Sequence, residues 1–427
     1  MASRQTTMME LSAQDRECLS GHEGPALKHS MSLLCSVAAA SGARRLVDVT
    51  QAHLVGAYYG GKADLKLVER IVATGARVAV PTTLNASSVD LRQPERYTQK
   101  EAEFRNSCRI VRLYERLGCR LELTCAPYHL PQQPQRGERV AWAESNAVVY
   151  ANSVIGARTE KVYQYLDLCA ALTGRIPEYG LYITENRRAK VLLRIADIPN
   201  RWLSEDSFYQ LLGLVLGKLY DGRVIAVVGI PVDATEDQLR GLGAAAACTG
   251  NVSLFHAIGR TPEAPTQDAA FHGHPPEEVL SIDSSAIREV RDSLSHTTTN
   301  TVNAVALGAP HFSHAEFKRL AELLDGRRIH SSMRCFVSTS RHTYREITAN
   351  GVMAVLESAG VQVLTDTCTY YGSLLRSHDA AVMTSSAKWA YYAPGNLGVS
   401  VRFERIEDCV ATAVAGKLSV DEGFWGA

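Results

Sequence analysis

Two of the ten cysteines directly follow apolar runs that predict buried strands. Cys125 lies in TCAPY after RLEL, and Cys368 lies in TDTC after VQVL. Cys409 opens the last predicted helix, where amide groups and the helix dipole favour a thiolate. Three thiolates are a plausible ligand set for an iron–sulfur cluster. From spacing alone, a buried apolar thiol remains the alternative for each of them.

The cysteines form no CxxC pair and lie far apart in the chain. The first 30 residues carry charged side chains and no long apolar core, so the sequence predicts a cytoplasmic protein without a signal peptide. Cytoplasmic thiols stay reduced, which argues against a disulfide framework. A metal site must therefore gather its ligands from distant parts of the chain.

Two further segments contain several polar side chains among mostly apolar residues. In RVAWAESNAVVYANSVIGART (139–159), Glu144 is a candidate general acid or base, and Arg158 a candidate clamp for a carboxylate. The alternative for both is a charge that complements a helix end. In MTSSAKWAYYAPGNLG (383–398), the hydroxyls of Ser385 and Ser386 and the ammonium of Lys388 suit an anionic ligand.

The motifs of several enzyme classes are missing. The chain contains no GxxxxGK[ST], HExxH or GxSxG, and no GxGxxG that opens a helix after a strand. These absences argue against P-loop NTPases, zincins, serine hydrolases and Rossmann dehydrogenases.

Strands and helices alternate along most of the chain, which predicts an α/β fold with mostly parallel sheets. RVAV (77–80), RLELT (120–124) and VQVLTD (361–366) are typical of buried strands, and NAVVYANSVIG (146–156) is typical of a helix. Segments rich in polar residues repeatedly follow a predicted strand. Ligands bind at the carboxyl ends of strands in such sheets, so seven of these loops could line one cleft. The Pro- and His-rich segment 259–283 predicts a long loop or a junction between subdomains.

The charge balance argues against two classes of partner. Lys+Arg and Asp+Glu both number 45, and no basic stripe or acidic tail stands out. A nucleic acid or an anionic membrane surface therefore has no electrostatic support as a partner. No window approaches the roughly 20 apolar residues that span a bilayer.

The sequence resembles one family, aconitase X of the aconitase superfamily, over nearly the whole chain. The most specific pieces, in order, are VAVPTTLN (78–85), TCAPY (124–128), AWAESNAVVYANSVIGART (141–159), FHAIGRTPEAPT (255–266), LTDTC (364–368) and MTSSAKWAYYAPG (383–395). The resemblance implies a dehydratase that acts on cis-3-hydroxy-L-proline or, alternatively, on mevalonate 5-phosphate. It also implies an iron–sulfur centre, [2Fe-2S] or [4Fe-4S], or a mononuclear iron. The cysteines in its motifs are Cys125, Cys368 and Cys409, with Cys335 as the fallback.

The resemblance also suggests roles for polar residues. We expect Arg158, Thr159 and Lys388 to bind the substrate's anionic group. Positioning or proton transfer is expected of His53, Thr83, Asn85, Glu144, Ser385 and Ser386, with Glu144, Lys388 and Ser386 as the catalytic candidates. The open iron of a three-thiolate cluster would act as a Lewis acid on the substrate's hydroxyl.

Three departures from the family pattern bear on the substrate. Glu160 replaces Asn in GARTN, TCAPY stands for TCTPY, and Ser385 replaces Asn in TNSAK. A negative charge at Glu160 could repel an anionic substrate, which keeps open a diverged, non-catalytic member that binds a metabolite.

Related enzymes also use a small swivelling domain that closes over the site. The chain stops at GFWGA, soon after the last predicted helix, and no segment of the sequence is expected to form that domain. We therefore expect residues 1–427 to be the catalytic large subunit, with the swivel domain on a separate subunit of about 130–150 residues.

Overall fold

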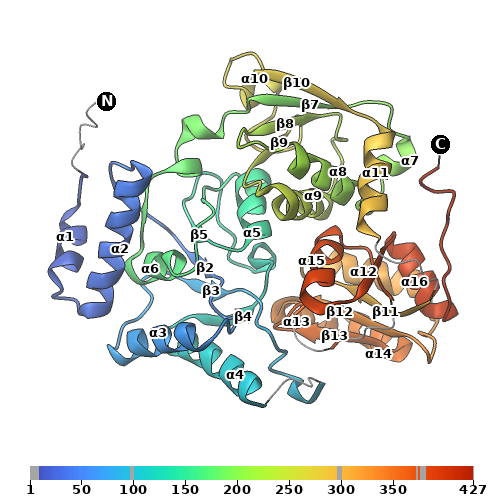
Figure 1. Cartoon of the computed structure of the whole chain (residues 1–427), viewed down its shortest axis with the longest axis horizontal. Helices are drawn as coiled ribbons and strands as arrows, with labels where there is room; N and C mark the ends of the chain where they lie inside the picture. The colour runs from blue at the N-terminus through green and yellow to red at the C-terminus, as the bar shows by residue number, and fades with distance from the viewer. Residues whose placement is uncertain (1–8, 97–100, 296–300, 372–373, 376–380, 427) are drawn as a thin grey trace.

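Three sheets, each flanked by helices, follow one another along the chain (Figure 1). The computed structural model describes residues 9–96, 101–295, 301–371, 374–375 and 381–426. Within each of the three sheets every neighbouring pair of strands is parallel. The predicted α/β class is therefore confirmed. We call the parts of the chain built around these sheets the first, second and third units.

The first unit contains a sheet with the order β4-β3-β2-β5. Its strands are β2 (Ala52–Leu54), β3 (Thr82–Leu84), β4 (Arg120–Leu123) and β5 (Ala141–Trp142). A separate antiparallel pair joins β1 (Leu46–Asp48) to β6 (Arg175–Pro177). The helices are α1 (Ala13–Ser20), α2 (Pro25–Ser41), α3 (Lys62–Ala73), α4 (Glu101–Arg116), α5 (Ser145–Tyr150), a π-helical turn (Ala151–Ile155) and α6 (Leu166–Thr173).

The predicted strand at 77–80 lies earlier in the chain than the strand of the structure, which is β3 (Thr82–Leu84). The amide of Val78 donates to the carbonyl of Leu117, and that of Ala79 to Ala171. These backbone groups are satisfied at the ends of α4 and α6, so the apolar run approaches the sheet without pairing in it.

The second unit contains a sheet with the order β10-β7-β8-β9. Its strands are β7 (Val191–Ile195), β8 (Ile225–Val228), β9 (Phe255–Ala257) and β10 (Glu278–Ile282). Its helices are α7 (Asn200–Leu203), α8 (Asp206–Leu219), α9 (Glu236–Gly250), α10 (Gln267–Ala270) and α11 (Ser284–Leu294). The segment 259–283 supplies α10 and the edge strand β10 of this sheet.

The third unit contains a sheet with the order β13-β12-β11-β14-β15. Its strands are β11 (Val302–Leu307), β12 (Arg334–Thr339), β13 (Val361–Thr365), β14 (Ala381–Thr384) and β15 (Ser400–Phe403). Its helices are α12 (His314–Leu324), α13 (Arg341–Ala349), α14 (Val352–Ala359), α15 (Ala387–Leu397) and α16 (Ile406–Ala415). Gly351, with a φ of 85°, separates α13 from α14.

Local sequence explains several helix starts. Three helices begin with capping boxes, formed by the pairs Ser12–Asp15, Thr235–Gln238 and Ser313–Glu316. In each box the hydroxyl accepts from the third backbone amide of the helix, and the side chain at that position accepts from the cap's own amide. These contacts satisfy amide groups that have no partner within the helix.

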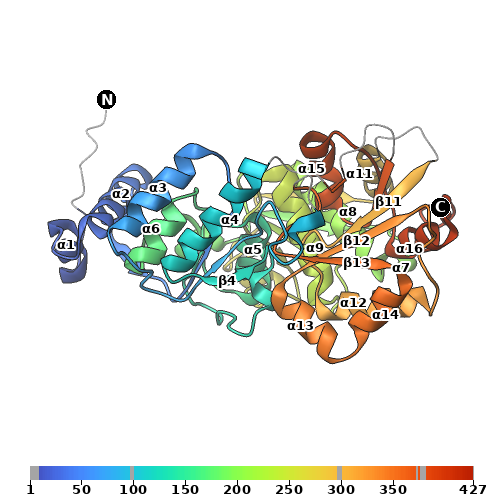
Figure 2. The ribbon, with the colours of Figure 1, turned by 90° about the horizontal axis from the view of Figure 1, so that it is seen from below.

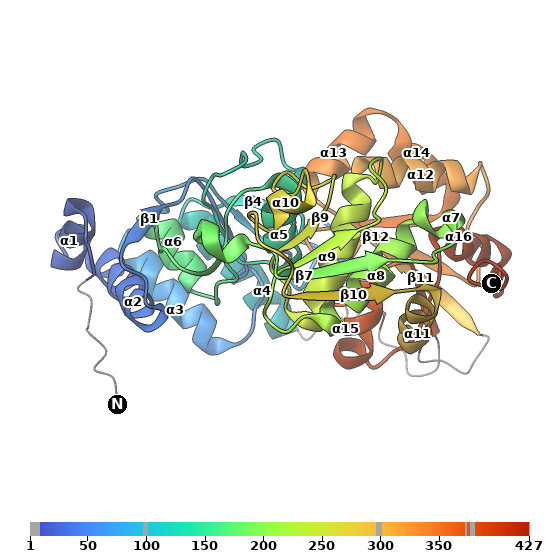
Figure 3. The same ribbon diagram turned by 90° about the horizontal axis from the view of Figure 1, so that it is seen from above.

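The three units are packed together. One hydrophobic core cluster contains Leu212 of α8, Leu242 of α9 and Trp389 of α15, so the second and third units share apolar side chains. The first unit is tied to the third by Asp90, whose carboxylate accepts from the amide of Thr365 at 3.0 Å. Figures 2 and 3 show α1 and α2 at one end of the long axis and α14 and α16 at the other. Among the described residues, no helix has the length and apolar character needed to cross a bilayer.

Candidate active site

The carboxyl ends of strands from the first and third sheets bring two cysteines and a histidine together. Cys125 follows β4, His311 follows β11 and Cys368 follows β13, and all three side chains are buried. Their potential ligand atoms lie within 4.8 Å of one another. The loops meet because Ser87 of the first unit forms a parallel bridge with Thr367 of the third.

Hydrogen bonds fix the imidazole of His311 between the two cysteine loops. Its Nε2 lies 3.0 Å from the carbonyl oxygen of Thr367, and its Nδ1 lies 3.0 Å from Oγ1 of Thr124. A carbonyl only accepts, so Nε2 carries a proton. Metal-binding histidines usually donate their other ring N–H to such a carbonyl or carboxylate.

The two thiols share one environment but differ in acidity. Burial opposes ionisation of Cys125, but a hydrogen bond from Cys368 and the charges of His311 and Lys388 lower its pKa to about 6. The same hydrogen bond, together with burial, raises the pKa of Cys368 above its ordinary value. The amide of His311 also donates to the sulfur of Cys125 at 3.2 Å. The pair therefore favours a thiolate at Cys125, which is the form that binds metals.

A buried ion pair acts on this group. Nζ of Lys388 donates to Oε1 of Glu144 at 2.5 Å, and both side chains are less than a tenth exposed. Burial raises the pKa of Glu144, but Lys388 and the amides of Asn146 and Ala147 lower it below its ordinary value. Burial lowers the pKa of Lys388, but Glu144 raises it well above its ordinary value. At neutral pH the pair is therefore a carboxylate and an ammonium.

Local structure places both partners at helix starts. Glu144 is the N-cap of α5, and its Oε2 accepts from the amide of Asn146 at 2.5 Å. The side-chain amide of Asn146 donates in turn to the carbonyl of Cys125 at 3.0 Å. Lys388 lies in the first turn of α15. The segment 383–395, which contains Pro394 and Gly395, is therefore largely helical.

His53 of β2 and Thr83 of β3 lie opposite each other on the two central strands of the first sheet. Nδ1 of His53 lies 2.8 Å from the hydroxyl of Thr83, and Nε2 has no hydrogen-bond partner among the described residues. Burial lowers the pKa of His53 to about 4, although Glu144 raises it. Asn85 follows β3, where its Oδ1 accepts from the amide of Ala86 at 2.8 Å. His53 is therefore a neutral imidazole with one free nitrogen near Glu144.

The hydroxyl of Ser386 is fully engaged. It accepts from the amide of Trp389 at 3.0 Å as the N-cap of α15, and it donates to the carbonyl of Ala309. Its side chain thus connects α15, which carries Lys388, with the loop that carries His311. This placement favours a positioning role over proton transfer.

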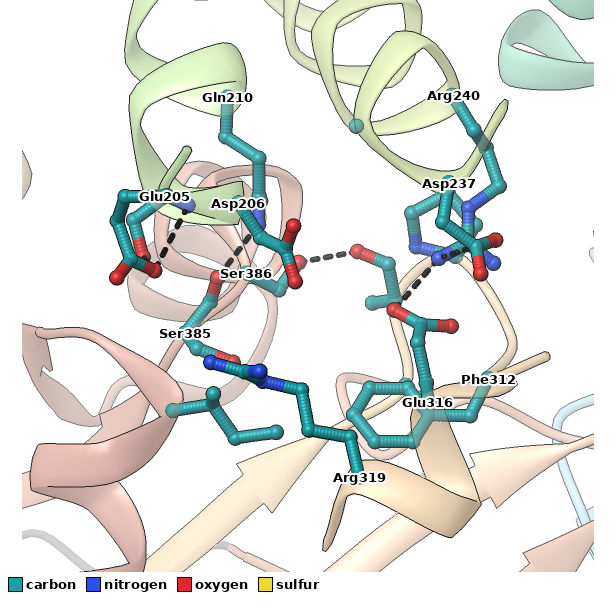
Figure 4. A pocket seen from close by; sticks show the side chains of 16 residues that line it. Glu205, Asp206, Gln210, Asp237, Arg240, Phe312, Glu316, Arg319, Ser385 and Ser386 are labelled. Atoms are coloured by element: carbon teal, nitrogen blue, oxygen red, sulfur yellow. Dashed lines mark hydrogen bonds and ion pairs between the residues drawn. The ribbon is translucent and has the colours of Figure 1, made fainter. Parts of the chain in front are cut away.

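Figure 4 shows the chamber behind these loops, between α8, α9 and the third unit. Gln210 of α8 donates to the carbonyl of Ser385 at 2.7 Å and accepts from the amide of Ala387 at 2.7 Å. Ser385 therefore faces the chamber, and its backbone is held by the second unit.

Arg240 of α9 supports the other loop. It donates to the carbonyl of His311 at 2.9 Å and lies 2.6 Å from Glu316 and 3.4 Å from Asp237. Burial raises the pKa of Glu316 to about 7, against the opposing charge of Arg240. The second unit thus holds the loops of both His311 and Lys388.

Cys409 and Cys335 do not join Cys125 and Cys368. Both lie in the core that α12, α14 and α16 form with the third sheet. Burial and the charge of Glu404 raise the pKa of Cys409 well above its ordinary value, and burial raises that of Cys335 to about 12. The start of α16 faces this apolar core, so its dipole does not produce a metal-binding thiolate there.

Arg158 and Thr159, expected at the substrate's anionic group, form hydrogen bonds with other parts of the chain. Nη1 of Arg158 donates to the carbonyl of Tyr182 at 3.0 Å and to the hydroxyl of Thr184 at 2.8 Å. Thr159 exchanges hydrogen bonds with the backbone of Trp142. Both residues therefore fasten the loop after the π-helical turn.

The carboxylate of Glu160 accepts hydrogen bonds from backbone amides. Its Oε2 accepts from the amide of Leu181 and its Oε1 from the amide of Lys161, each at 2.8 Å. This engagement weakens the expectation that its charge repels an anionic substrate.

Sequence reasoning missed His311 as a candidate. His311 could have been found from its position in APHFSH, a segment that follows a strand, as the segments of Cys125 and Cys368 do. Histidines at such positions are often structural, and His256 is one, since its Nε2 lies 2.8 Å from the carbonyl of Arg187.

Comparison with known proteins divides the chain into three matched regions. The family models match as Aconitase X first domain over residues 8–185, second domain over 189–292 and third domain over 302–415. These regions coincide with the three units around the three sheets.

Curated relatives and a solved structure extend this likeness. The chain is 39% identical to a cis-3-hydroxy-L-proline dehydratase of Pseudomonas aeruginosa, covering 97% of this chain and 72% of that protein. A protein of the same name from Hypocrea jecorina is also 39% identical, with 96% and 69% covered. The phosphomevalonate dehydratase large subunit of Methanosarcina mazei is 33% identical, with 96% and 98% covered. The crystal structure of Thermococcus kodakaraensis aconitase X in its holo-form matches with a TM-score of 0.85 and 29% identity, with 95% and 100% covered.

Proposed function

Because the chain belongs to the aconitase X family, we propose that it dehydrates cis-3-hydroxy-L-proline to Δ1-pyrroline-2-carboxylate. The relatives reported above are named dehydratases, and the two that are 39% identical carry the name of this reaction. The observation that carries the proposal is the buried Lys388–Glu144 ion pair beside Cys125, His311 and Cys368.

The ion pair suits removal of the proton α to a carboxylate. Lys388 holds the pKa of Glu144 low against burial. When a substrate carboxylate takes the hydrogen bond of Lys388, burial of Glu144 is less well compensated, and the pKa of Glu144 rises. A more basic carboxylate accepts the α-proton more readily. The C–O bond to the β-hydroxyl then breaks, and the hydroxide that leaves together with the abstracted α-proton makes up the water lost. The enamine tautomerises to the cyclic imine.

A metal centre on Cys125, Cys368 and His311 fits the donor chemistry. This donor set differs from the three thiolates expected from the sequence, because the described residues bring together two thiols and one imidazole. Thiolate and imidazole ligands suit iron and zinc ions. A bound metal would supply Lewis-acid assistance to departure of the substrate's hydroxyl. A centre on reduced thiols also suits a cytoplasmic location.

Neutral groups complete the proposed substrate site. The free Nε2 of His53 is a buried polar atom that a substrate hydroxyl or ammonium would satisfy. Thr83 orients the ring through Nδ1, while Ser386 positions α15. We propose His53 as a binding residue and Lys388 as the partner of the substrate's carboxylate.

Mevalonate 5-phosphate is the second candidate substrate. Its support is the likeness to the Methanosarcina mazei protein, which at 33% identity is less close than the two hydroxyproline dehydratases. That protein is named a large subunit, and the chain covers 98% of it. On this ground we propose that the chain works with a separate small swivel-domain subunit.

A substrate panel tests the proposal. The metal-loaded chain, alone and with a candidate small subunit, is incubated with cis-3-hydroxy-L-proline, trans-4-hydroxy-L-proline and mevalonate 5-phosphate. We expect loss of one water from cis-3-hydroxy-L-proline, seen by mass spectrometry. The trans-4 isomer is the matched control, because its hydroxyl is not β to the carboxylate. Turnover of the phosphate alone would favour the second candidate, and no turnover of any substrate would favour a diverged, non-catalytic protein.

A further inference from the structure

A cavity of about 860 Å³ lies between the first and second units and reaches Ala143, the neighbour of Glu144. Four cationic side chains contribute to its wall: Lys161, Arg188, Lys190 and Arg223. None of these four cations was singled out from the sequence. The cavity approaches the ion pair from a side that the proposed function leaves unassigned.

Three of the four cations pair with carboxylates, and Glu160 and Glu185 also line the cavity. Arg188 and Lys190 lie 3.3 and 3.6 Å from Glu277, and Arg223 lies 2.7 Å from Asp221. These pairs are partly exposed, so their charges are largely compensated and screened.

Lys161 differs from the other three. No carboxylate oxygen lies within 4.0 Å of its Nζ in the part of the chain that the structure describes. Its ammonium donates to the neutral side-chain oxygen of Asn251, at the C-cap of α9. A half-buried ammonium with a neutral partner retains its capacity for an anion.

The backbone around Lys161 is firmly held. Nδ2 of Asn152 donates to the carbonyls of both Thr159 and Ser253 at 2.9 Å, which fastens the loop of Lys161 to the loop of Asn251. The neighbouring Glu160 is occupied by backbone amides, as described above. The position of Lys161 therefore does not depend on a bound ligand.

Lys161 also lies within electrostatic reach of the ion pair. The charges of Glu144 and Lys388 both act on it, although burial has the largest effect and lowers its pKa. The ammonium thus lines the cavity and interacts with the groups proposed to carry out proton transfer.

We propose that this cavity admits the substrate and that Lys161 binds the substrate's carboxylate on its way to Lys388. Lys161 takes the place that the sequence suggested for Arg158, whose guanidinium is bound to Tyr182 and Thr184. The inference rests on the proposed function, since it assumes an anionic hydroxy acid. It makes Lys161 a specificity-determining residue for acids over neutral analogues.

Kinetics of Lys161 variants test the inference. We expect Lys161→Met to raise KM for cis-3-hydroxy-L-proline about 10- to 100-fold, the effect of losing one charge-assisted hydrogen bond. Because chemistry takes place at Glu144 and Lys388, kcat should change much less. Lys161→Arg should restore most of the affinity, and Lys218→Met, an exposed lysine at the end of α8, is the matched control. An unchanged KM in Lys161→Met would overturn the inference.

A binding measurement separates this inference from the proposed function. Pyrrole-2-carboxylate carries the carboxylate but no hydroxyl to lose, and its affinity is measured by calorimetry with metal-loaded protein. If the protein binds it through Lys161 but dehydrates no substrate, the inference stands and the proposed function falls. If wild type and Lys161→Met bind it equally, the inference falls even where wild type turns over hydroxyproline.

Discussion

At the scale of single residues, the arrangement depends on burying opposite charges together. Glu144 and Lys388 are each less than a tenth exposed, and an isolated charge at that depth is costly. Their pairing, with amide donors at the start of α5, makes the ionised forms tolerable. A site of this kind is sensitive to removal of either partner.

The first prediction concerns that sensitivity. Lys388→Met should abolish dehydration and lower the free energy of unfolding by about 3–5 kcal/mol, because Glu144 is left buried without its cation. The double variant Glu144→Gln/Lys388→Met should recover most of the stability but none of the activity. Urea denaturation and the dehydration assay check this. Equal stability of the wild type and Lys388→Met would contradict the account.

The second prediction concerns pH. The pKa of Glu144 lies below its ordinary value of 4.5 in the folded protein, so the carboxylate contributes stability above the unfolded pKa. That contribution is lost as the pH falls through the folded value. His53 acts in the same direction, because its folded pKa of about 4 lies below its ordinary value of 6.5. Its contribution to stability is therefore lost as the pH falls from 6.5 towards 4. Glu144→Gln should flatten the profile below pH 4.5 only, measured by thermal denaturation at a series of pH values.

The third prediction concerns the metal. Cys125→Ser and Cys368→Ser should lower bound metal at least about 10-fold after anaerobic loading, because the thiolate ligands are lost. Cys409→Ser and Cys335→Ser are matched controls and should retain it, since both thiols lie in another core. Elemental analysis measures the content. Loss of metal in Cys409→Ser, to the same extent as in Cys125→Ser and Cys368→Ser, would restore the trio expected from the sequence.

At the scale of elements, the ends of parallel strands explain what could be foreseen. Cys125 and Cys368 were expected because each follows an apolar run, and β4 and β13 do place them at neighbouring sheet edges. Position along the chain does not tell which way a helix faces, and this is why Cys409 was expected at the site. The start of α16 faces the core of the third unit.

Side-chain partners from remote segments could not be foreseen either. Arg158 follows the π-helical turn as expected, but Tyr182 and Thr184, more than 20 residues away, take its guanidinium. His311 gains its place from hydrogen bonds to residues that neighbour both cysteines. Such pairings depend on how the units pack, which periodicity does not encode.

The fourth prediction tests support from the second unit. Gln210→Ala removes two hydrogen bonds to the loop before α15, so we expect a loss of about 1–3 kcal/mol in stability and a drop in kcat. Gln267→Ala, an exposed glutamine in α10, is the matched control. A decrease in stability with unchanged kcat would show that α8 supports the fold but not the position of Lys388.

At the scale of the whole molecule, three units share one site that none of them completes alone. The first unit contributes Cys125 and Glu144, the third contributes Cys368 and Lys388, and the second holds loops of the third. The match covers 72% of the cis-3-hydroxy-L-proline dehydratase from Pseudomonas aeruginosa. It covers 98% of the phosphomevalonate dehydratase large subunit from Methanosarcina mazei.

The fifth prediction follows from that comparison. A small subunit that covers the site should raise the dehydration rate at least about 10-fold by excluding water and completing the catalytic set. Co-elution in size-exclusion chromatography and rates at increasing subunit ratio measure this. Full turnover by the chain alone would exclude the need for a partner.

The most direct test of the central claim compares one rate in two proteins. Metal-loaded wild type and Glu144→Gln, with the small subunit present, are assayed for conversion of cis-3-hydroxy-L-proline to the cyclic imine acid. The account predicts turnover by wild type and a loss of at least about 100-fold in Glu144→Gln, because the group that accepts the α-proton is gone. Equal rates in the two proteins, or no conversion by the wild type, would contradict it.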